Sequence, residues 1–157
     1  MRARAGGRWR SIGPGLVVVL LGACVWWGVH PPRTEETYRQ ESAHTVELLR
    51  SQVETARIWL EEKDAGKVTT FAVEVALTET ETDAESVLSG YAAHQPPGRE
   101  ATRLRGDVTA LGDRVVALLG SVRVDARAGR WAEAVAAAED LAALSRELRV
   151  LRRRALP

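Results

Sequence analysis

The side chains in this sequence that are best suited to bind a metal or take part in catalysis are those of a Glu–His pair. Glu41 and His44 are three positions apart, so a helix would place them one turn apart on one face, a spacing that suits iron ligands in four-helix bundles. A di-iron site needs a second such pair, but the residue three positions before His94 is Tyr91, which is not an acid. We interpret Glu41 and His44 as solvated helix-face residues. A metal- or haem-binding bundle centred on them is the alternative.

No other combination of side chains matches a catalytic arrangement. The chain has three His and one Cys, and it has neither a Cys/His metal motif nor a glycine-rich phosphate loop after a strand. No serine can be matched with a positioned base. The sequence therefore predicts a protein that is not an enzyme and has no catalytic, cofactor or metal site. No small-molecule substrate can be assigned.

An uncharged apolar stretch near the N-terminus predicts a membrane anchor. Residues 11–32 contain no Asp, Glu, Lys or Arg, and residues 13–30 would form a helix close to the shortest that crosses a bilayer. All four charged residues of the segment 1–10 are arginines, so the positive-inside rule predicts a basic cytoplasmic N-terminus there. Residues 33–157 are then expected outside the cell membrane.

The cysteine inside this anchor allows a different interpretation. Leu21 to Cys24 reads LGAC, which resembles the lipobox of bacterial lipoproteins, where a signal peptidase cuts before the cysteine and leaves it lipidated. Residues 25–29 continue the apolar run, whereas a lipoprotein usually becomes polar at this point. We prefer an uncleaved transmembrane span. A lipoprotein signal peptide ending at Cys24 is the first alternative, and simple cleavage is the second.

The charges are distributed unevenly along a chain whose formal net charge is +1. Residues 33–98 carry 6 basic and 13 acidic residues, whereas residues 99–157 carry 12 basic and 8 acidic residues. Two oppositely charged halves suit packing against each other, whereas nucleic acid requires a concentrated cationic face. We therefore predict no nucleic-acid binding. Residues 33–157 are enough for one domain.

Three short breaks divide residues 33–157 into four segments. The breaks are DAGK at 64–67, HQPPGRE at 94–100 and RAGR at 127–130, and each contains a Gly that can end a helix. In the first, third and fourth segments, apolar residues recur at spacings of three and four, which predicts amphipathic helices. The three stripes are Ser42, Val46, Leu49, Val53, Ala56 and Leu60; Leu104, Val108, Leu111, Val115, Leu118 and Val122; and Ala134, Ala137, Leu141, Leu144, Leu148 and Leu151.

The second segment is ambiguous, because FAVEVALTETETD alternates apolar and polar residues as a half-buried strand does. A strand there would lack a partner, and the length between breaks favours a helix, with Val73, Leu77, Thr80, Ala84, Val87 and Tyr91 as its stripe. Short connections between long amphipathic helices predict antiparallel neighbours with a coiled-coil-like supercoil. The sequence therefore predicts an all-α fold: an N-terminal transmembrane helix followed by an antiparallel up-down-up-down four-helix bundle.

This topology predicts which parts of the bundle return to the membrane. The loop at 94–100 and the C-terminus would lie on the membrane side. The arginines there, Arg152, Arg153 and Arg154, complement the dipole of the last helix in our preferred interpretation. In a second interpretation they contact anionic lipid headgroups, at about 1 kcal/mol per charge. Trp59 and Trp131 would lie at the distal end, where we hypothesise an exposed patch for a protein partner.

Three longer stretches, in a chain with 20 Arg and 2 Lys, resemble uncharacterised membrane-anchored helical-bundle proteins of high-GC actinobacteria. The stretches are VELLRSQVETARIWLEEKDAG, DAESVLSGYAAHQPP and LGDRVVALLGSVRVDARAGRWAEAV. The resemblance covers most of the chain after residue 40 and implies no activity. The sequence as a whole predicts a single-pass membrane protein that displays its bundle as a non-enzymatic interaction or accessory module.

Overall fold

The computed structural model of the protein describes residues 34–156. Within this range the chain forms helices and no strand. The helices are α2 (Glu35–Asp64), α3 (Thr70–Ala92), α4 (Arg99–Arg127), α5 (Trp131–Ala136) and α6 (Ala138–Ala155). The all-α fold class is therefore confirmed for the described part of the chain.

The predicted anchor lies outside the described residues. This holds for the basic segment 1–10, for residues 11–32 and for Cys24. Among the helices of residues 34–156, none combines the length and the apolar character that crossing a bilayer requires. The transmembrane span and the lipidated cysteine both stay predictions.

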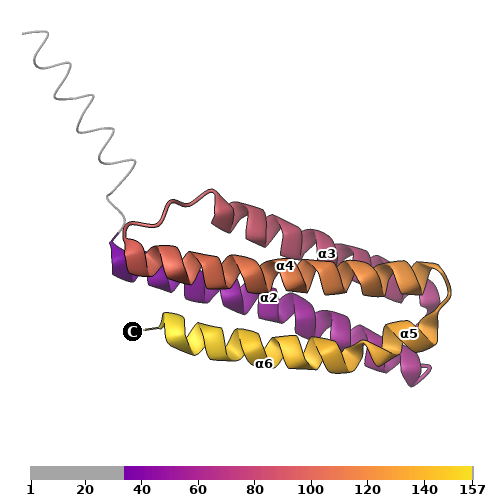
Figure 1. Ribbon diagram of the computed structural model, residues 1–157. Helices are drawn as coiled ribbons and strands as arrows, with labels where there is room; N and C mark the ends of the chain where they lie inside the picture. Colours follow the sequence, from indigo (N-terminus) through magenta and orange to yellow (C-terminus); the bar gives the residue numbers. More distant parts are fainter. Residues whose placement is uncertain (1–33, 157) are drawn as a thin grey trace, which may run out of the picture. The chain divides into compact units, whose positions relative to one another are not determined.

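The helices form a bundle in which consecutive long helices run in opposite directions, and α5 and α6 together supply the fourth rod (Figure 1). The start of α2, the loop between α3 and α4, and the end of α6 lie at one end, which we call the entry end. The two glycine-containing turns lie at the opposite end, which we call the turn end. Helix α2 packs against α6, α3 and α4, whereas α3 and α6 do not contact each other.

The helices begin and end where the sequence breaks predict. The hydroxyls of Thr34 and Thr69 accept hydrogen bonds from backbone N–H groups in the first turns of α2 and α3, at 3.1 and 3.3 Å. Gly66 and Gly129 have φ angles of 69° and 74°, a left-handed conformation that disfavours residues with a side chain. Both turns therefore depend on glycine, and they reverse the chain after α2 and α4.

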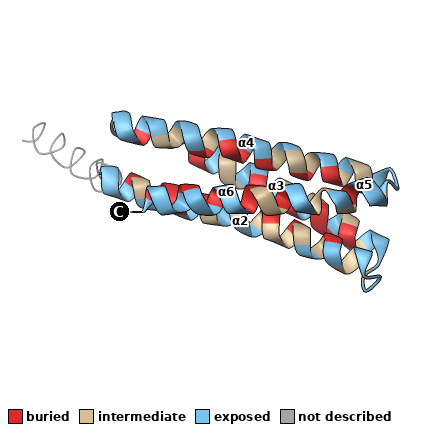
Figure 2. Cartoon of the chain, turned by 60° about the horizontal axis from the view of Figure 1, so that its bottom comes forward, coloured by how far each residue is buried: buried red, intermediate tan, exposed pale blue. Residues whose placement is uncertain are grey.

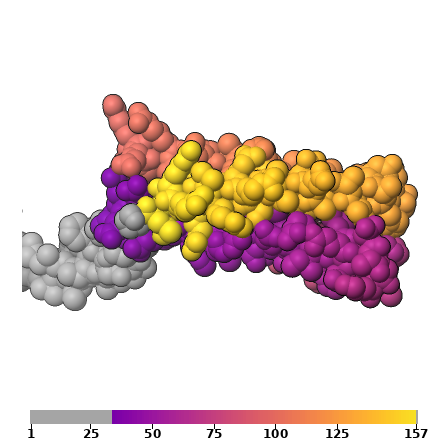
Figure 3. All heavy atoms as spheres, turned by 90° about the horizontal axis from the view of Figure 1, so that it is seen from below, coloured from indigo at the N-terminus to yellow at the C-terminus, as the bar shows by residue number. Residues whose placement is uncertain are grey.

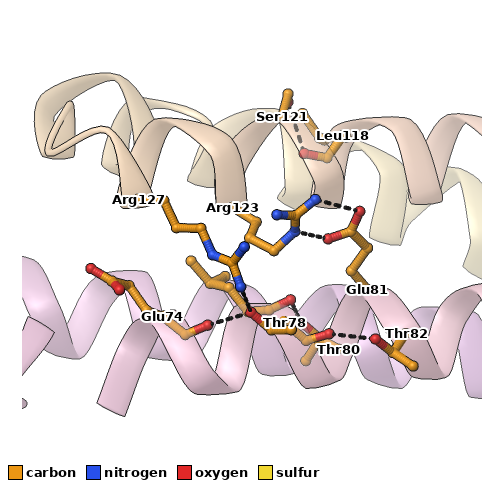
Figure 4. A network of polar contacts seen from close by, with 10 residues as sticks. Glu74, Thr78, Thr80, Glu81, Thr82, Leu118, Ser121, Arg123 and Arg127 are labelled. Carbon is orange, nitrogen blue, oxygen red and sulfur yellow. Dashed lines mark hydrogen bonds and ion pairs between the residues drawn. The ribbon is translucent and has the colours of Figure 1, made fainter. Parts of the chain in front are cut away.

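Helix α3 forms although its sequence alternates like a strand. Three threonine hydroxyls donate to carbonyl oxygens of the preceding turn: Thr78 to Glu74, Thr80 to Leu77 and Thr82 to Thr78, at 2.8, 3.0 and 2.9 Å (Figure 4). This bonding satisfies the hydroxyls within the helix, so β-branched residues are accommodated without a strand partner. The helical interpretation of this segment is confirmed.

Buried residues recur along each long helix, which gives the bundle one continuous core (Figure 2). The predicted stripe of α2 is buried throughout, and so are the stripe positions within α6, whereas Ala137 between α5 and α6 is only half-buried. In α4 the prediction is wrong at two positions: Leu104 and Leu118 are only half-buried, and Leu119 rather than Leu118 is fully buried. A helix with 3.6 residues per turn drifts relative to a strict 3.5 spacing, so the buried position moves by one residue along its length.

The predicted fourth helix is interrupted at one residue. Ala137 separates α5 from α6, with φ −66° and ψ −10°, so the backbone tightens locally toward 3₁₀ geometry. Hydrogen bonds from Ala137 N to Glu133 O and from Leu141 N to Ala137 O keep the two pieces in line. The rod therefore continues across the interruption. The residues around the interruption are mostly alanines, whose small side chains make few contacts that would keep the helix regular.

Candidate functional site

Within residues 34–156, the structure does not complete a set of metal ligands around the Glu–His pair singled out from the sequence. His44 is exposed, whereas Glu41 is partly buried and its Oε2 lies 3.6 Å from Nδ1 of His94, which follows α3. Within residues 34–156, no three His, Cys, Asp or Glu side chains are grouped as metal ligands. The structure therefore brings Glu41 to a different histidine from the one that helical spacing suggested.

Three hydroxyl-bearing side chains meet in the core near the entry end. The Ser42 hydroxyl donates to the carbonyl of Tyr38 at 2.8 Å, and its oxygen lies 2.9 Å from the hydroxyl of Tyr91. The rings of Tyr38 and Tyr91 are 5.9 Å apart. Burial is the largest influence on the Tyr91 hydroxyl and raises its pKa, because a phenolate would lose its hydration. These are neutral packing partners that join α2 to α3.

The two tryptophans predicted to form a patch are not freely exposed. Trp59 and Trp131 are partly buried and pack against the core, and the Lys63 ammonium lies 4.9 Å from the centre of a Trp131 ring. The hypothesis of an exposed indole patch therefore finds no support. The most exposed large apolar side chain at the turn end is instead Phe71, which is 76% exposed in the first turn of α3.

The described surface has a groove between α4 and α6. Its volume is about 490 Å³, and Figure 3 shows this face, with α6 in yellow between the orange of α4 and the purple of α2. An apolar floor is flanked by charged side chains, most of them arginines. The lining residues are Asp107, Ala110, Leu111, Arg114, Arg146, Glu147, Val150, Leu151 and Arg154.

The groove continues toward the entry end into a smaller depression of about 160 Å³. The two depressions share three lining residues, Asp107, Leu151 and Arg154, so they form one continuous surface. The smaller one adds two arginines, Arg103 of α4 and Arg39 of α2, and two acids, Glu100 of α4 and Glu35 of α2, and Arg39 pairs with Glu100 at 3.5 Å. The result is a channel along the α4–α6 seam that has arginines on both sides.

The position of α4 explains why the seam is open. A Cβ placed on Gly112 would lie 2.7 Å from Leu88 Cδ1 and 3.4 Å from Leu49 Cδ1. The absence of a side chain therefore lets α4 approach α3 and α2 closely. On the α3 side, two arginines of α4 bind α3: Arg123 pairs with Glu81, and Arg127 bonds to the Thr78 hydroxyl (Figure 4). Because α4 is held against α3 and α2, few contacts form between α4 and α6, and a groove remains between these two helices.

One ion pair crosses the groove. Arg114 of α4 donates to both carboxylate oxygens of Glu147 on α6, at 2.6 and 3.0 Å. This bidentate pairing lowers the pKa of the Glu147 carboxyl. Both side chains are about half exposed, so the pair contributes little to stability. Its main consequence is to fix two side chains over the groove floor.

The arginines at the end of α6 are exposed, as both interpretations of them require. Arg152 pairs with Glu47 of α2 at 3.3 Å, and Arg154 lines the groove. Arg50 is the first cause of the lowered pKa of Glu47, and Arg152 adds to it. Sequence analysis assigned these arginines to the helix dipole or to lipid. It missed the place of Arg154 on the rim of a groove, which depends on how α4 and α6 pack.

Comparison with known proteins adds no assignment: no family model, no curated protein and no solved structure matches this chain.

Proposed function

We propose that the protein is a non-enzymatic, single-pass membrane protein that displays its helical bundle outside the cell membrane as an interaction module. The arginines before residue 11 and the uncharged residues 11–32 support the anchor and its orientation. The observation that carries the interaction function is the α4–α6 groove, a concave apolar surface with a charged rim. Grooves of this kind receive the apolar face of a helix.

The chemistry of the groove defines the kind of partner it fits. The floor offers Leu111, Val150 and Leu151 to an apolar or small-residue stripe. On the rim, Arg114 is already paired with Glu147, whereas Arg146 and Arg154 make no ion pair with any residue of the described range. A helix with acidic residues beside its stripe would supply the missing counter-charges. We therefore propose an acidic amphipathic helix as the occupant.

Site-specific photo-crosslinking in membranes of expressing cells tests this proposal. A photoreactive residue replaces Val150, which is 39% exposed in the groove. The matched control replaces Ile58 of α2, which is 52% exposed and lies away from the groove. We expect a discrete crosslinked product from position 150 and none from position 58. Equal products from both positions would show that the groove is an ordinary surface.

Charge variants establish whether the product depends on the arginine rim. The double variant Arg146→Glu with Arg154→Glu should reduce the product at position 150 at least tenfold, because like charges would then face each other. The corresponding double variant to Lys keeps the charges and should retain most of the product. If the Glu variant crosslinks as well as the native rim, the proposed acidic partner is wrong.

The anchor itself is tested separately. Mass spectrometry of the N-terminus of the mature protein distinguishes an uncleaved span, a lipidated Cys24 and simple cleavage by their different masses. Protease treatment of intact cells should digest the bundle, because all three states place it outside the cytoplasm. A bundle protected until the cells are lysed would refute the proposed location.

A second function for the end of α6 is supported by the exposure of Arg152, Arg153 and Arg154. We propose that these residues contact anionic lipid headgroups near the anchor. Replacement of all three by Gln in the full-length protein should make it easier to extract from anionic vesicles than the native chain, and should leave extraction from zwitterionic vesicles unchanged. Equal extraction of the native chain and the variant from anionic vesicles would leave only the dipole interpretation.

A further inference from the structure

Phe71 is an aromatic side chain that the bundle itself does not use. It stands in the first turn of α3 and is 76% exposed. The Thr69 hydroxyl caps this helix. Val68 and Val73 occupy the two positions whose apolar side chains pack together at a helix start, and both contribute to the core. The fold of a single chain therefore does not account for the Phe71 ring.

A hollow lies beside this ring on the surface of α3. Its volume is about 370 Å³. The lining residues are Phe71, Glu74, Val75, Thr78, Glu79 and Arg127. The first five share one face of α3, since they are three or four residues apart, and none of them is buried. One patch therefore combines a projecting ring with a recess next to it.

The charged side chains around the hollow lack counter-charges within the described chain. The Arg127 guanidinium bonds to the neutral hydroxyl of Thr78 at 3.3 Å (Figure 4), and it makes no ion pair with any residue of 34–156. The carboxylates of Glu74 and Glu79 make no ion pair in that range either. The rim of the hollow thus carries both signs of charge, and each could still accept a partner.

The two acids lie on opposite sides of the hollow. Glu81, two turns after Glu74, pairs with α4, so Glu74 lies on the α4 side together with Arg127. Asp83, one turn after Glu79, lies 3.5 Å from a side chain of α2, so Glu79 lies on the α2 side. An acid is therefore present on either side of the recess.

We propose that the occupant of this hollow is Phe71 of a second copy of the chain, in a symmetric dimer. A two-fold contact brings the same patch of both copies together, so the patch must be complementary to itself. Here each copy offers a ring and a recess of about 370 Å³, together with charges of both signs. Each ring enters the other recess, over Val75 and beside Arg127, whose guanidinium is attracted to an aromatic face.

The charges favour this dimer in either relative direction of the two α3 helices. If the helices run parallel, the two-fold axis lies along them and Arg127 of one copy meets the α2 side of the other hollow, where Glu79 lies. If they run antiparallel, Arg127 meets the α4 side, where Glu74 lies. Either way each arginine gains an acid. The patch is small and exposed, so we expect a weak dimer that high salt disfavours.

This surface is independent of the α4–α6 groove, because the two share no lining residue. A dimer through α3 leaves the groove open to the partner proposed above. Each proposal has its own crosslinking position, so either one can fail while the other stands.

Photo-crosslinking of full-length chains in membranes of expressing cells tests the dimer. The photoreactive residue replaces Thr82, which is exposed one turn beyond Thr78 on the same face and leaves the hollow intact. We expect a product of twice the mass of the chain. Phe71→Ser should reduce this product at least tenfold, whereas the matched control Ile58→Ser, at a site 52% exposed on α2, should retain it. A product of any other mass, or a dimer that survives Phe71→Ser, would overturn the inference.

Charge reversal in two differently tagged copies gives a second test. One copy carries Arg127→Glu, and the other carries Glu74→Lys with Glu79→Lys. Each variant expressed alone should lose the dimer product at least fivefold, because like charges then face each other. Co-expression should restore a product that contains both tags to at least half of the native amount, since every reversed group meets a reversed counterpart. A mixed product as scarce as that of the separate variants would contradict the proposed pairing.

Discussion

The contact between Ser145 and Glu54 gives the sharpest prediction about what holds α6 on α2. The Ser145 side chain is almost fully buried, at 2% exposure, and its hydroxyl donates to the Glu54 carboxylate at 2.5 Å. The Glu54 carboxylate also accepts from Arg57 at 3.0 Å. A buried hydrogen bond to a charged group contributes about 1.5–3 kcal/mol to stability. Ser145→Ala should therefore lower the free energy of unfolding by about this amount at neutral pH.

The pH dependence of this loss follows from the carboxyl group. The Ser145 hydroxyl is the first cause of the lowered pKa of Glu54, and Arg57 adds to it. Because the folded pKa is lowered, this contribution is present above the ordinary value near 4.5 and is lost as the pH falls below it. In Ser145→Ala the pKa moves back toward that value, so the variant loses less on acidification. The two stability curves should therefore converge in acid.

Urea denaturation of full-length protein in neutral detergent micelles, followed by far-ultraviolet circular dichroism at several pH values, measures both effects. Ser121→Ala is the matched control, because Ser121 is exposed and its hydroxyl bonds only to Leu118 of its own helix. The control should change the free energy of unfolding by less than about 0.5 kcal/mol. An unchanged stability of Ser145→Ala, or a loss that stays constant from neutral pH to acid, would refute the reasoning.

Three further outcomes are expected for the folded bundle. Burial raises the pKa of Tyr91. The stability of the bundle should therefore be intact below the ordinary tyrosine pKa of about 10 and fall as the pH rises above it. Tyr91→Phe should flatten this decline in alkaline denaturation curves. Gly106→Ala should stabilise the bundle by about 0.5–1 kcal/mol, because the added Cβ meets open space beside α4. Gly112→Ala should destabilise the bundle or leave its stability unchanged, because the added Cβ lies 2.7 Å from Leu88. Thermal melts compare the two variants. Phe71→Ser should change the free energy of unfolding by less than about 0.5 kcal/mol, because the ring is 76% exposed, and a larger loss in urea would show that the ring packs.

The elements of the bundle could be predicted because helix packing leaves a direct mark on the sequence. Leucines and valines at spacings of three and four must face the core, and the stripes of α2 and α6 are buried accordingly. The glycines at 66 and 129 end helices because they adopt positive φ angles. In α3, the length of the segment was a better guide than its alternation, since threonines can bond to their own helix.

The candidate site could not be predicted in the same way. The groove depends on how closely α4 approaches α2 and α3, which the single residue Gly112 helps to decide. Spacing along one helix also contains no information about partners from other helices, so Glu41 was matched with His44 although His94 lies beside it. The arginine-rich end of α6 was the one visible signal of the groove. Without the position of α4, these arginines are equally compatible with contact to lipid, with a helix dipole and with the rim of a docking groove.

The buried hydroxyls of Ser42 and Tyr91 have a consequence for how the helices find their alignment. A seam made only of leucines and valines tolerates slippage, because after a shift of one heptad aliphatic residues would again meet aliphatic residues. Such a shift would leave the Tyr91 hydroxyl facing hydrocarbon, at a cost of about 1–3 kcal/mol, whereas Ser42 would keep its bond to the Tyr38 carbonyl of its own helix. The pair therefore selects a single alignment of α3 on α2 from several that bury almost the same apolar surface.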